Sequence, residues 1–358
     1  MTDSAAPLRV KFLARGHASG DHALWLRQFP GRIPRWGECV FRFDQDARDY
    51  DWLVVYDDLP PRPGERRSHR VETLACPRRH TLLVTTEPSS IKYYGRGFLA
   101  QFGYVLTSQE HWAIPHPDPI FGQSGYRWFY GVGPEGLRDY DRMVAHPPLA
   151  KTGLISTVTS AKRQRHTLHD RRHAFVQALA QRLPELERFG HGIRPVGDKA
   201  EAMDPFRYHV AIENHIAPHH WTEKLADCFL ALSLPFYHGA PDAGDYFPEG
   251  SFVPVDLDDP DASARLIRET MARDHYAHHL PQLREARRRV LEEYNLFALL
   301  ARVIAERHAP AATGGAQGRI HGRHGFRRRH PALALEQLLV QTRWQLLARR
   351  GKAPGAGR

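Results

Sequence analysis

Residues 206–239 read FRYHVAIENHIAPHHWTEKLADCFLALSLPFYHG, and their pattern decides the fold class. The apolar run over 206–213 predicts a buried strand, the segment 222–233 predicts a helix, and the run over 234–239 predicts another strand. A strand, a helix and a strand in this order are typical of a parallel α/β unit.

Similar strand-like runs recur along the chain on both sides of this stretch. They occupy 8–14, 50–56, 81–86 and 104–108 in the N-terminal half, and 152–160 and 251–256 in the C-terminal half. Continuous apolar runs of this length are what buried parallel strands require. Residues 170–183 predict a helix with one apolar face, and 261–307 predict a helical region. The stretch 111–136, rich in Pro, Gly and aromatic residues, predicts a long ordered loop.

Two series of strands predict two Rossmann-like domains that face a central ligand-binding cleft. A length of 358 residues suits two domains of roughly 150 residues each. We expect an N-terminal domain over 1–150, a second α/β domain over 151–308, and a C-terminal segment over 309–358. The composition of that segment predicts a basic flexible linker followed by an amphipathic helix.

The composition is that of a soluble globular protein, with 42% hydrophobic and 25% charged residues. The first residues lack the pattern of a secretory signal, and no run of 18 apolar residues occurs. Cys39, Cys76 and Cys228 are odd in number and widely spaced, so they define neither a disulfide framework nor a zinc motif. We therefore expect a cytoplasmic protein with reduced thiols.

The formal net charge of +10 is concentrated in residues 309–358, where ten Lys and Arg residues accompany a single acid, Glu336. The folded body is nearly neutral, which argues against a nucleic-acid-binding surface there. The C-terminal segment has two interpretations. It attaches peripherally to the anionic inner face of a membrane, or its last helix packs on the body with Trp344 buried.

Residues 213–224 place charged side chains between a strand and a helix. Thr222 is positioned to cap the helix that Glu223 and Lys224 begin. A lysine in the first turn is unfavourable for the helix itself, because its charge faces the positive end of the helix dipole. A bound diphosphate would reverse this penalty, since helix starts attract phosphate. The alternative is an ordinary cap with a solvated lysine.

Two patterns resemble metal sites. His215, His219 and His220 flank Pro218 in a loop and lack the fixed spacing of ligands on one helix face, so we expect polar packing or donor contact and no metal. The acidic run over 256–261 follows a strand and precedes a helix. We therefore interpret it as a turn in which Asp259 or Asp261 caps the helix.

About 50 residues, from FRYHVAIEN to GSFVPVD, resemble the donor-binding segment of the α-1,3/1,4-fucosyltransferases of glycosyltransferase family 10. The matching elements, in order, are Glu213-Asn214, Thr222-Glu223-Lys224, Leu234-Pro235 through Gly239-Ala240, Asp245 to Pro248, and Gly250-Ser251-Phe252. The segments RRHAFVQAL and LLVTTEPSS match the family more weakly, and no family signal occurs beyond about residue 275.

The resemblance implies a GT-B-like fold and inverting transfer of L-fucose from GDP-fucose to a saccharide hydroxyl, without a required metal or other cofactor. It points to Glu87 as the catalytic base. It also implies that Arg172, with Arg171 as its rival, faces the donor diphosphate together with Lys224. The remaining donor-binding residues that it implies are Asn214, His220 and Glu223. The acceptor would bind mainly on the first domain and the nucleotide sugar mainly on the second.

Two departures from the family pattern leave the donor open. His220 stands where the family often has tyrosine, and His215 replaces a small polar residue. The first alternative is therefore a related transferase that uses another nucleotide sugar. A non-catalytic nucleic-acid-binding protein is the second alternative, but it leaves residues 206–256 unexplained, and we expect no nucleic-acid partner.

Overall fold

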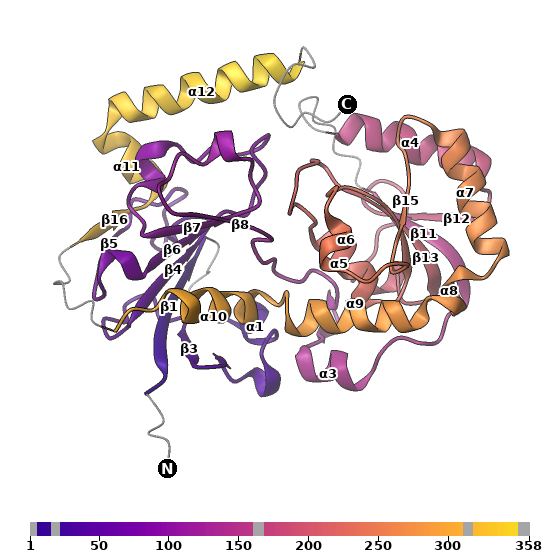
Figure 1. Cartoon of the computed structure of the whole chain (residues 1–358), viewed down its shortest axis with the longest axis horizontal. Coiled ribbons are helices and arrows are strands. Elements are labelled where there is room, and N and C mark those ends of the chain that lie inside the picture. Colours follow the sequence, from indigo (N-terminus) through magenta and orange to yellow (C-terminus); the bar gives the residue numbers. More distant parts are fainter. Residues whose placement is uncertain (1–5, 16–21, 160–167, 311–317, 350–358) are drawn as a thin grey trace. The chain divides into compact units, whose positions relative to one another are not determined.

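The computed structural model describes residues 6–15, 22–159, 168–310 and 318–349. The chain divides into two compact units (Figure 1). The first comprises Met1–Gly125 and Leu296–Ala356, and the second comprises Tyr126–Asn295. These bounds differ from the predicted domain limits at 150 and 308, because the first crossover occurs earlier and the chain returns to the first unit at Leu296.

Core packing explains both differences. Trp128, Tyr130 and Met143, which precede residue 150, are buried in the core of the second unit. Helix α10 (Leu296–Arg307) packs in the core of the first unit. Its Phe297 ring lies 4.2 Å from that of Phe29, centroid to centroid. Neither contact leaves a break in composition that the sequence could reveal.

The first unit is built on a mostly parallel sheet with the order β2-β3-β1-β4-β6-β7-β8. Its strands are β1 (Leu8–Ala14), β2 (Arg35–Trp36), β3 (Cys39–Arg42), β4 (Trp52–Tyr56), β6 (Thr81–Val84), β7 (Tyr104–Thr107) and β8 (Pro119–Phe121). Only the short edge strand β2 runs antiparallel to its neighbour in this sheet. The four predicted N-terminal strands are confirmed, whereas β8 lies within the stretch that we expected to be loop.

Short helices and the C-terminal segment complete the first unit. The helical elements are α1 (Ala23–Leu26), η1 (Pro30–Arg32), η2 (Arg78–His80), α2 (Arg96–Leu99), η3 (His111–Ala113), α10, α11 (Arg323–Arg329) and α12 (Pro331–Arg349). A separate two-stranded ribbon joins β5 (Val71–Thr73) to β16 (Arg319–His321) in antiparallel register.

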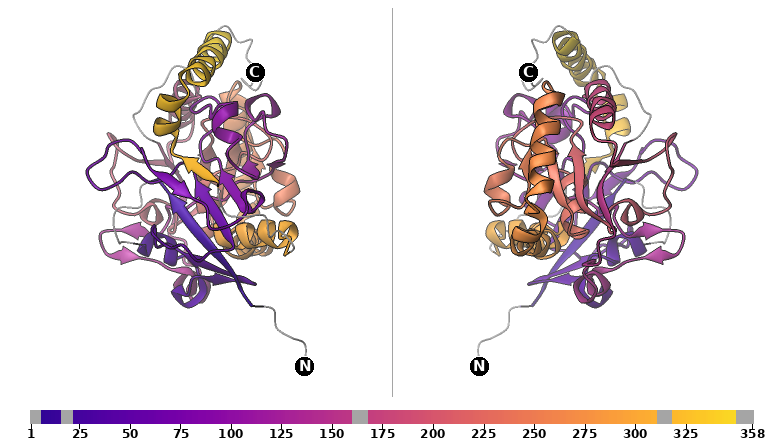
Figure 2. Two further views of the ribbon diagram at one scale, coloured as in Figure 1. Left: turned by 90° about the vertical axis from the view of Figure 1, so that its left-hand side faces the viewer. Right: turned by 90° about the vertical axis from the view of Figure 1, so that its right-hand side faces the viewer.

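The predicted flexible linker over 314–330 is therefore wrong for residues 319–329, which form β16 and α11 (Figure 2). Residues 311–317 lie outside the described part. Main-chain pairing with β5 orders this basic segment although it has little apolar content. On α12, Trp344 is buried, and its ring stacks 5.9 Å from that of Trp112. The interpretation in which the last helix packs on the body is thus confirmed for this face of α12.

The second unit contains a parallel sheet with the order β12-β11-β13-β14-β15. Its strands are β11 (Gly153–Val158), β12 (Leu186–Phe189), β13 (Phe206–Ile212), β14 (Leu234–His238) and β15 (Val253–Pro254), and a hairpin joins β9 (Val132–Gly133) to β10 (Gly136–Leu137). Together with the first sheet, this architecture confirms the predicted α/β class with two Rossmann-like units.

Helices cover both faces of this second sheet. They are α3 (Tyr140–Ala145), α4 (His169–Arg182), η4 (Lys199–Ala202), α5 (Glu223–Leu230), α6 (Ala243–Tyr246), α7 (Pro260–Ala272), α8 (His275–His278) and α9 (Leu280–Glu292). Helix α4 leads from β11 to one side and α5 leads from β13 to the other. Because such crossovers are right-handed, the two helices lie on opposite faces, and α4 packs with α7 while α5 packs with α9.

The core of the second unit contains an uncharged histidine that should make the protein sensitive to acid. Burial, with a contribution from Lys199, lowers the pKa of His209 to about 3. Its Nδ1 lies 2.8 Å from Ser156 Oγ. The pKa is lower in the folded state than in the unfolded state. The contribution of the neutral His209 to the free energy of unfolding is therefore complete above pH 6.5 and is lost as the pH falls toward 3.

We expect the free energy of unfolding to fall by about 2 kcal/mol between pH 6.5 and pH 5 because of this residue, at about 1.4 kcal/mol per pH unit. His209→Gln should remove that part of the pH dependence, and the exposed His191→Gln should not. Urea denaturation at both pH values checks this. An unchanged pH dependence in His209→Gln would assign the acid sensitivity to other groups.

Candidate functional site

The strand order fixes where a ligand site is expected in the second unit. Strand β11 has β12 on one side and β13 on the other, so the connections leave the sheet in opposite directions between β11 and β13. In open parallel sheets, ligands bind at the carboxyl ends of the strands at such a switch point. Helix α4 follows β11, and Glu213 and Asn214 follow β13, so both segments reach this edge of the sheet.

Arg172 and Asn214 meet across this switch point. Arg172 lies in the first turn of α4 and is 8% exposed, and its Nη1 donates a hydrogen bond of 2.8 Å to Asn214 Oδ1. Burial lowers the pKa of Arg172, although the charges of Glu213 and Glu223 oppose this. The neighbouring Arg171 instead pairs with Asp258. Of the two predicted arginines, Arg172 is therefore the one placed at the switch point.

Glu213 fixes the start of helix α5. Its two carboxylate oxygens accept hydrogen bonds from the Thr222 backbone N–H at 2.8 Å and from Thr222 Oγ1 at 2.7 Å. Glu213 is fully buried, and burial raises its pKa. A Cβ on Gly239 would lie 2.5 Å from Glu213 Cγ. The nearest atom to that Cβ would be Tyr237 Oη at 2.2 Å, so close packing against both Tyr237 and Glu213 requires a glycine at the end of the predicted strand over 234–239.

Lys224 lies between two carboxylates. Its Nζ is 3.3 Å from Glu213 Oε2 and 3.1 Å from Glu223 Oε1, and it donates to Thr222 Oγ1 at 3.1 Å. Burial opposes the charge on Lys224, but Glu223 and Glu213 outweigh it and raise its pKa. Burial likewise raises the pKa of Glu223, yet Lys224 and Lys199 lower it to about 2. Lys224 and Glu223 are therefore both ionised at neutral pH.

Protein groups already use the backbone donors of the first turn of α5. The Lys224 N–H donates to Thr222 Oγ1 at 3.3 Å, which confirms Thr222 as the cap. The N–H groups of Leu225 and Ala226 donate to the Thr222 carbonyl. An anion at this site would therefore be held by the side chains of Lys224 and Arg172, with the helix dipole adding a smaller contribution.

A second buried ion pair supports this cluster and was not predicted from the sequence. Lys199 Nζ lies 2.7 Å from Asp227 Oδ2, and the Asp227 side chain is 1% exposed. Asp227 lies one helical turn after Glu223 on α5, whereas Lys199 is in η4, 28 residues away. In the sequence, the acidic Asp227 within an apolar helix is the feature that indicates a buried ion pair, but the sequence does not identify Lys199 as its partner.

The three histidines have different environments. His220 is buried, and burial lowers its pKa well below the ordinary value, so it is neutral at physiological pH. Its Nδ1 lies 3.4 Å from Tyr126 Oη, and its ring packs edge-on against His215. His219 has a φ of 65° and its N–H donates to Asp242 at 2.8 Å. No group of three or more metal-ligating side chains suited to a metal ion occurs within the described ranges.

The acidic run over 256–261 forms the start of α7. Asp259 is the N-cap, and its carboxylate accepts from the Ala262 N–H at 2.8 Å. Asp258 and Asp261 form ion pairs with Arg171 and Arg182. The prediction of a helix cap at this run is confirmed for Asp259.

Glu87 belongs to the first unit, in the turn that follows β6. Its side chain is exposed, and its backbone carbonyl accepts a hydrogen bond of 2.6 Å from Gln109 Nε2. The next residues, Ser89 and Ser90, are buried, and their hydroxyl oxygens have no hydrogen-bond partner within the described part of the chain.

The switch point of the first sheet carries another polar group, which was not predicted from the sequence. It lies between β1 and β4, where Asp57 follows β4 with a φ of 73°. Asp57 pairs with Lys92 and accepts from Tyr94 Oη at 2.7 Å. Burial lowers the pKa of Lys92 to about 8. In the sequence, the dipeptide Asp57-Asp58 directly after a strand could have indicated this polar group.

No protein-family model and no curated protein matches the sequence. Among solved structures, an α1,3-fucosyltransferase is similar at 17% identity, with 78% of this chain and 82% of that chain covered and a TM-score of 0.47. The structure of an α1,3-fucosyltransferase with GDP-fucose aligns at 15% identity over 94% and 92% of the chains, with a TM-score of 0.44. One with GDP aligns at 15% identity over 83% and 94%, with a TM-score of 0.45. We base the function on the residues of the site.

Proposed function

We propose that the protein is an inverting glycosyltransferase that transfers fucose from GDP-fucose to a saccharide hydroxyl. One observation carries the proposal. Arg172, Asn214, Glu223 and Lys224, which the family pattern designates as donor-binding residues, come together at the switch point of one parallel sheet. A purely structural cluster would not need to occur at the edge where α/β proteins bind nucleotides.

The donor diphosphate would be held by two cations that differ in exposure. Arg172 is buried and fixed by Asn214, whereas the Lys224 side chain is 21% exposed. Charge-assisted hydrogen bonds from both would stabilise the negative charge that grows on GDP as the glycosidic bond breaks. No metal ion is then required for leaving-group stabilisation.

Sugar or ribose hydroxyls of the donor would be recognised by Glu223. With a pKa of about 2, its carboxylate stays ionised and accepts hydrogen bonds from hydroxyl groups. Neutral His220 supplies a ring that can contact the nucleotide without adding charge. Asn214 would act as a positioning residue, because its side-chain oxygen already orients the Arg172 guanidinium.

The acceptor hydroxyl must lose a proton as it attacks the sugar, and Glu87 would remove it as the general base. Its exposed carboxylate is accessible to a substrate.

A related transferase with another nucleotide sugar is the second candidate, because His215 and His220 depart from the family pattern. A thermal-shift panel of GDP-fucose, GDP-mannose, UDP-sugars and dTDP-sugars separates the two, since a ligand that binds the native state raises the melting temperature. A shift with GDP-fucose alone supports fucosyl transfer. A rise in melting temperature with a different nucleotide sugar would identify that compound as the donor in place of GDP-fucose. No rise with any of them would contradict the proposal.

Helix α12 leads us to propose peripheral membrane attachment. Leu335, Leu338, Leu339 and Leu346 are 57%, 59%, 61% and 49% exposed, and the cations Arg328, Arg329 and Arg343 are also exposed. No helix in the described ranges combines the length and apolarity needed to cross a bilayer. Exposed leucines beside arginines suit the surface of an anionic bilayer.

We expect the protein to sediment with vesicles that contain phosphatidylglycerol. The double variant Leu338→Gln/Leu339→Gln should bind the vesicles at least about tenfold more weakly, because two apolar side chains are lost from the contact. Vesicles of phosphatidylcholine alone should bind little of the wild-type protein. Equal sedimentation of variant and wild type would show that α12 is not the attachment site.

A further inference from the structure

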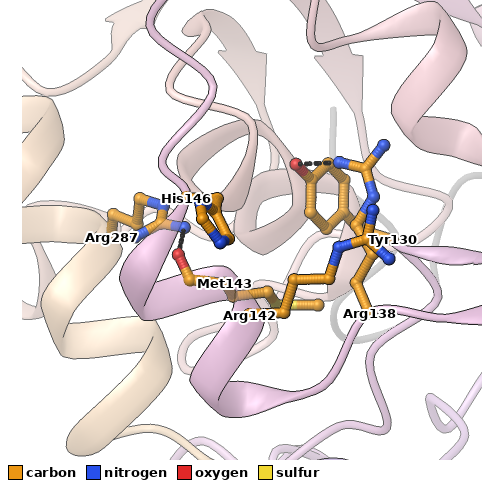
Figure 3. Close-up of a pocket in the computed structure, with 6 residues that line it drawn as sticks. All are labelled: Tyr130, Arg138, Arg142, Met143, His146 and Arg287. Atoms are coloured by element: carbon orange, nitrogen blue, oxygen red, sulfur yellow. Dashed lines mark hydrogen bonds between the residues drawn. The ribbon is translucent and has the colours of Figure 1, made fainter.

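A separate cavity of about 230 Å³ lies in the second unit (Figure 3). It is lined by Tyr130, Arg138, Arg142, Met143, His146 and Arg287. The residues come from the segment around α3 and from α9. Figure 3 shows the three arginines and His146 around one space. The cavity lies where Arg287 contacts the C-terminal end of α5, while Lys224 is at the opposite end of that helix.

Arg287 is a buried cation whose contacts are all to neutral groups. It is 7% exposed, and its Nε donates to the Leu230 carbonyl at 3.0 Å while Nη2 donates to the Met143 carbonyl. Within the described ranges, no carboxylate lies at ion-pair distance from it. Burial lowers its pKa, although Tyr130 and Asp204 oppose this. A buried charge with no carboxylate in direct contact is costly, and an anion in the cavity would offset that cost.

The cavity carries more positive than negative charge. Arg138 forms an ion pair with Asp204 at 2.6 Å and donates to Tyr130 Oη at 3.1 Å. Asp204 therefore compensates one guanidinium. Arg142 is exposed on α3 and, like Arg287, has no carboxylate at ion-pair distance in the described part of the chain. Asp204 also acts on Arg287 at longer range, so a single carboxylate faces the three guanidinium groups.

We propose that this arginine-lined cavity binds the phosphate group of a small phosphorylated molecule. Three guanidinium groups and one carboxylate leave an excess of two positive charges, which matches the double charge of a phosphate monoester. The planar fork of arginine also donates to two phosphate oxygens at once. The volume is below the roughly 300 to 1,000 Å³ of sites that enclose drug-sized ligands. It therefore suits a phosphate with a small substituent and not a whole nucleotide sugar. The inference is independent of the proposed transfer reaction.

Protection of arginines from phenylglyoxal tests the site residue by residue. The full-length protein is treated in a phosphate-free buffer with and without inorganic diphosphate, and modified peptides are quantified by mass spectrometry. Modification of Arg142 should fall about tenfold at a diphosphate concentration ten times the dissociation constant. The exposed Arg265 on α7 should be modified equally in both samples. Sodium chloride of equal ionic strength should not protect Arg142.

A charge-reversal variant provides a second test of the proposed phosphate site. Arg142→Glu changes an exposed side chain and should leave the melting temperature nearly unchanged, but it should weaken protection of Arg138 by diphosphate at least about tenfold. Arg265→Glu is the matched control and should leave that protection intact. The inference is overturned if Arg142 is modified equally with and without diphosphate, if chloride protects as well as diphosphate, or if Arg142→Glu binds as tightly as the control.

Discussion

Replacing Lys224 by alanine is expected to lower the free energy of unfolding by about 3 to 5 kcal/mol, the usual cost of removing one partner from a buried ion cluster. Lys224 Nζ contacts Glu213, which is fully buried, and Glu223, whose side chain is 21% exposed. Without the ammonium group, these two carboxylates lose their nearest counter-charge. Urea denaturation of the purified variant at pH 7 measures the loss.

Two further variants make this result specific. Glu223→Gln/Lys224→Met removes one charge of each sign and should recover part of the loss, because fewer unpaired charges remain buried. Arg265→Ala, at an exposed position, should stay within about 0.5 kcal/mol of the wild type. If Lys224→Ala is as stable as Arg265→Ala, the ammonium group is not the counter-ion of this cluster.

Glu87→Gln is expected to reduce the rate of fucosyl transfer by about 10² to 10⁴, the usual contribution of a general base. Glutamine keeps the size of the side chain but cannot accept the proton of the attacking hydroxyl. Binding of GDP should be unchanged, because Glu87 belongs to the first unit and the proposed donor-binding residues belong to the second. Release of GDP from GDP-fucose in the presence of a panel of saccharides measures the rate.

The exposed Glu38→Gln is the matched control in the same unit, and its rate should equal that of the wild type. If Glu87→Gln retains full activity, another group removes the proton. If it also loses GDP binding, the residue acts on the donor and not on the acceptor.

Strands with continuous apolar sequence were predicted well. Leu8–Ala14 forms β1 over the predicted range, and β13 ends one residue before the predicted limit. Burial on both faces of a parallel strand leaves this mark in the sequence. Strands such as β3 (Cys39–Arg42) and β12 (Leu186–Phe189) were not predicted, because their alternating or half-exposed residues do not form an apolar run.

Contacts between segments that are distant along the chain could not be predicted from the sequence. The apolar sequence of α10 predicts a helix but not its return to the first core, where Phe297 packs with Phe12. The same holds for the pairing of β16 with β5. The proposed donor cluster was predictable only where its members are close in sequence, because Glu213, Asn214 and Thr222 to Lys224 belong to a single strand–loop–helix segment. The choice of Arg172 over Arg171 and the partner of Asp227 required the fold.

A crystal structure of the protein with GDP tests the proposed location of the donor diphosphate most directly. We predict phosphate oxygens within hydrogen-bond distance of both Lys224 Nζ and the Arg172 guanidinium, at the carboxyl end of β13. A nucleotide bound with its phosphates away from these two side chains would contradict the account.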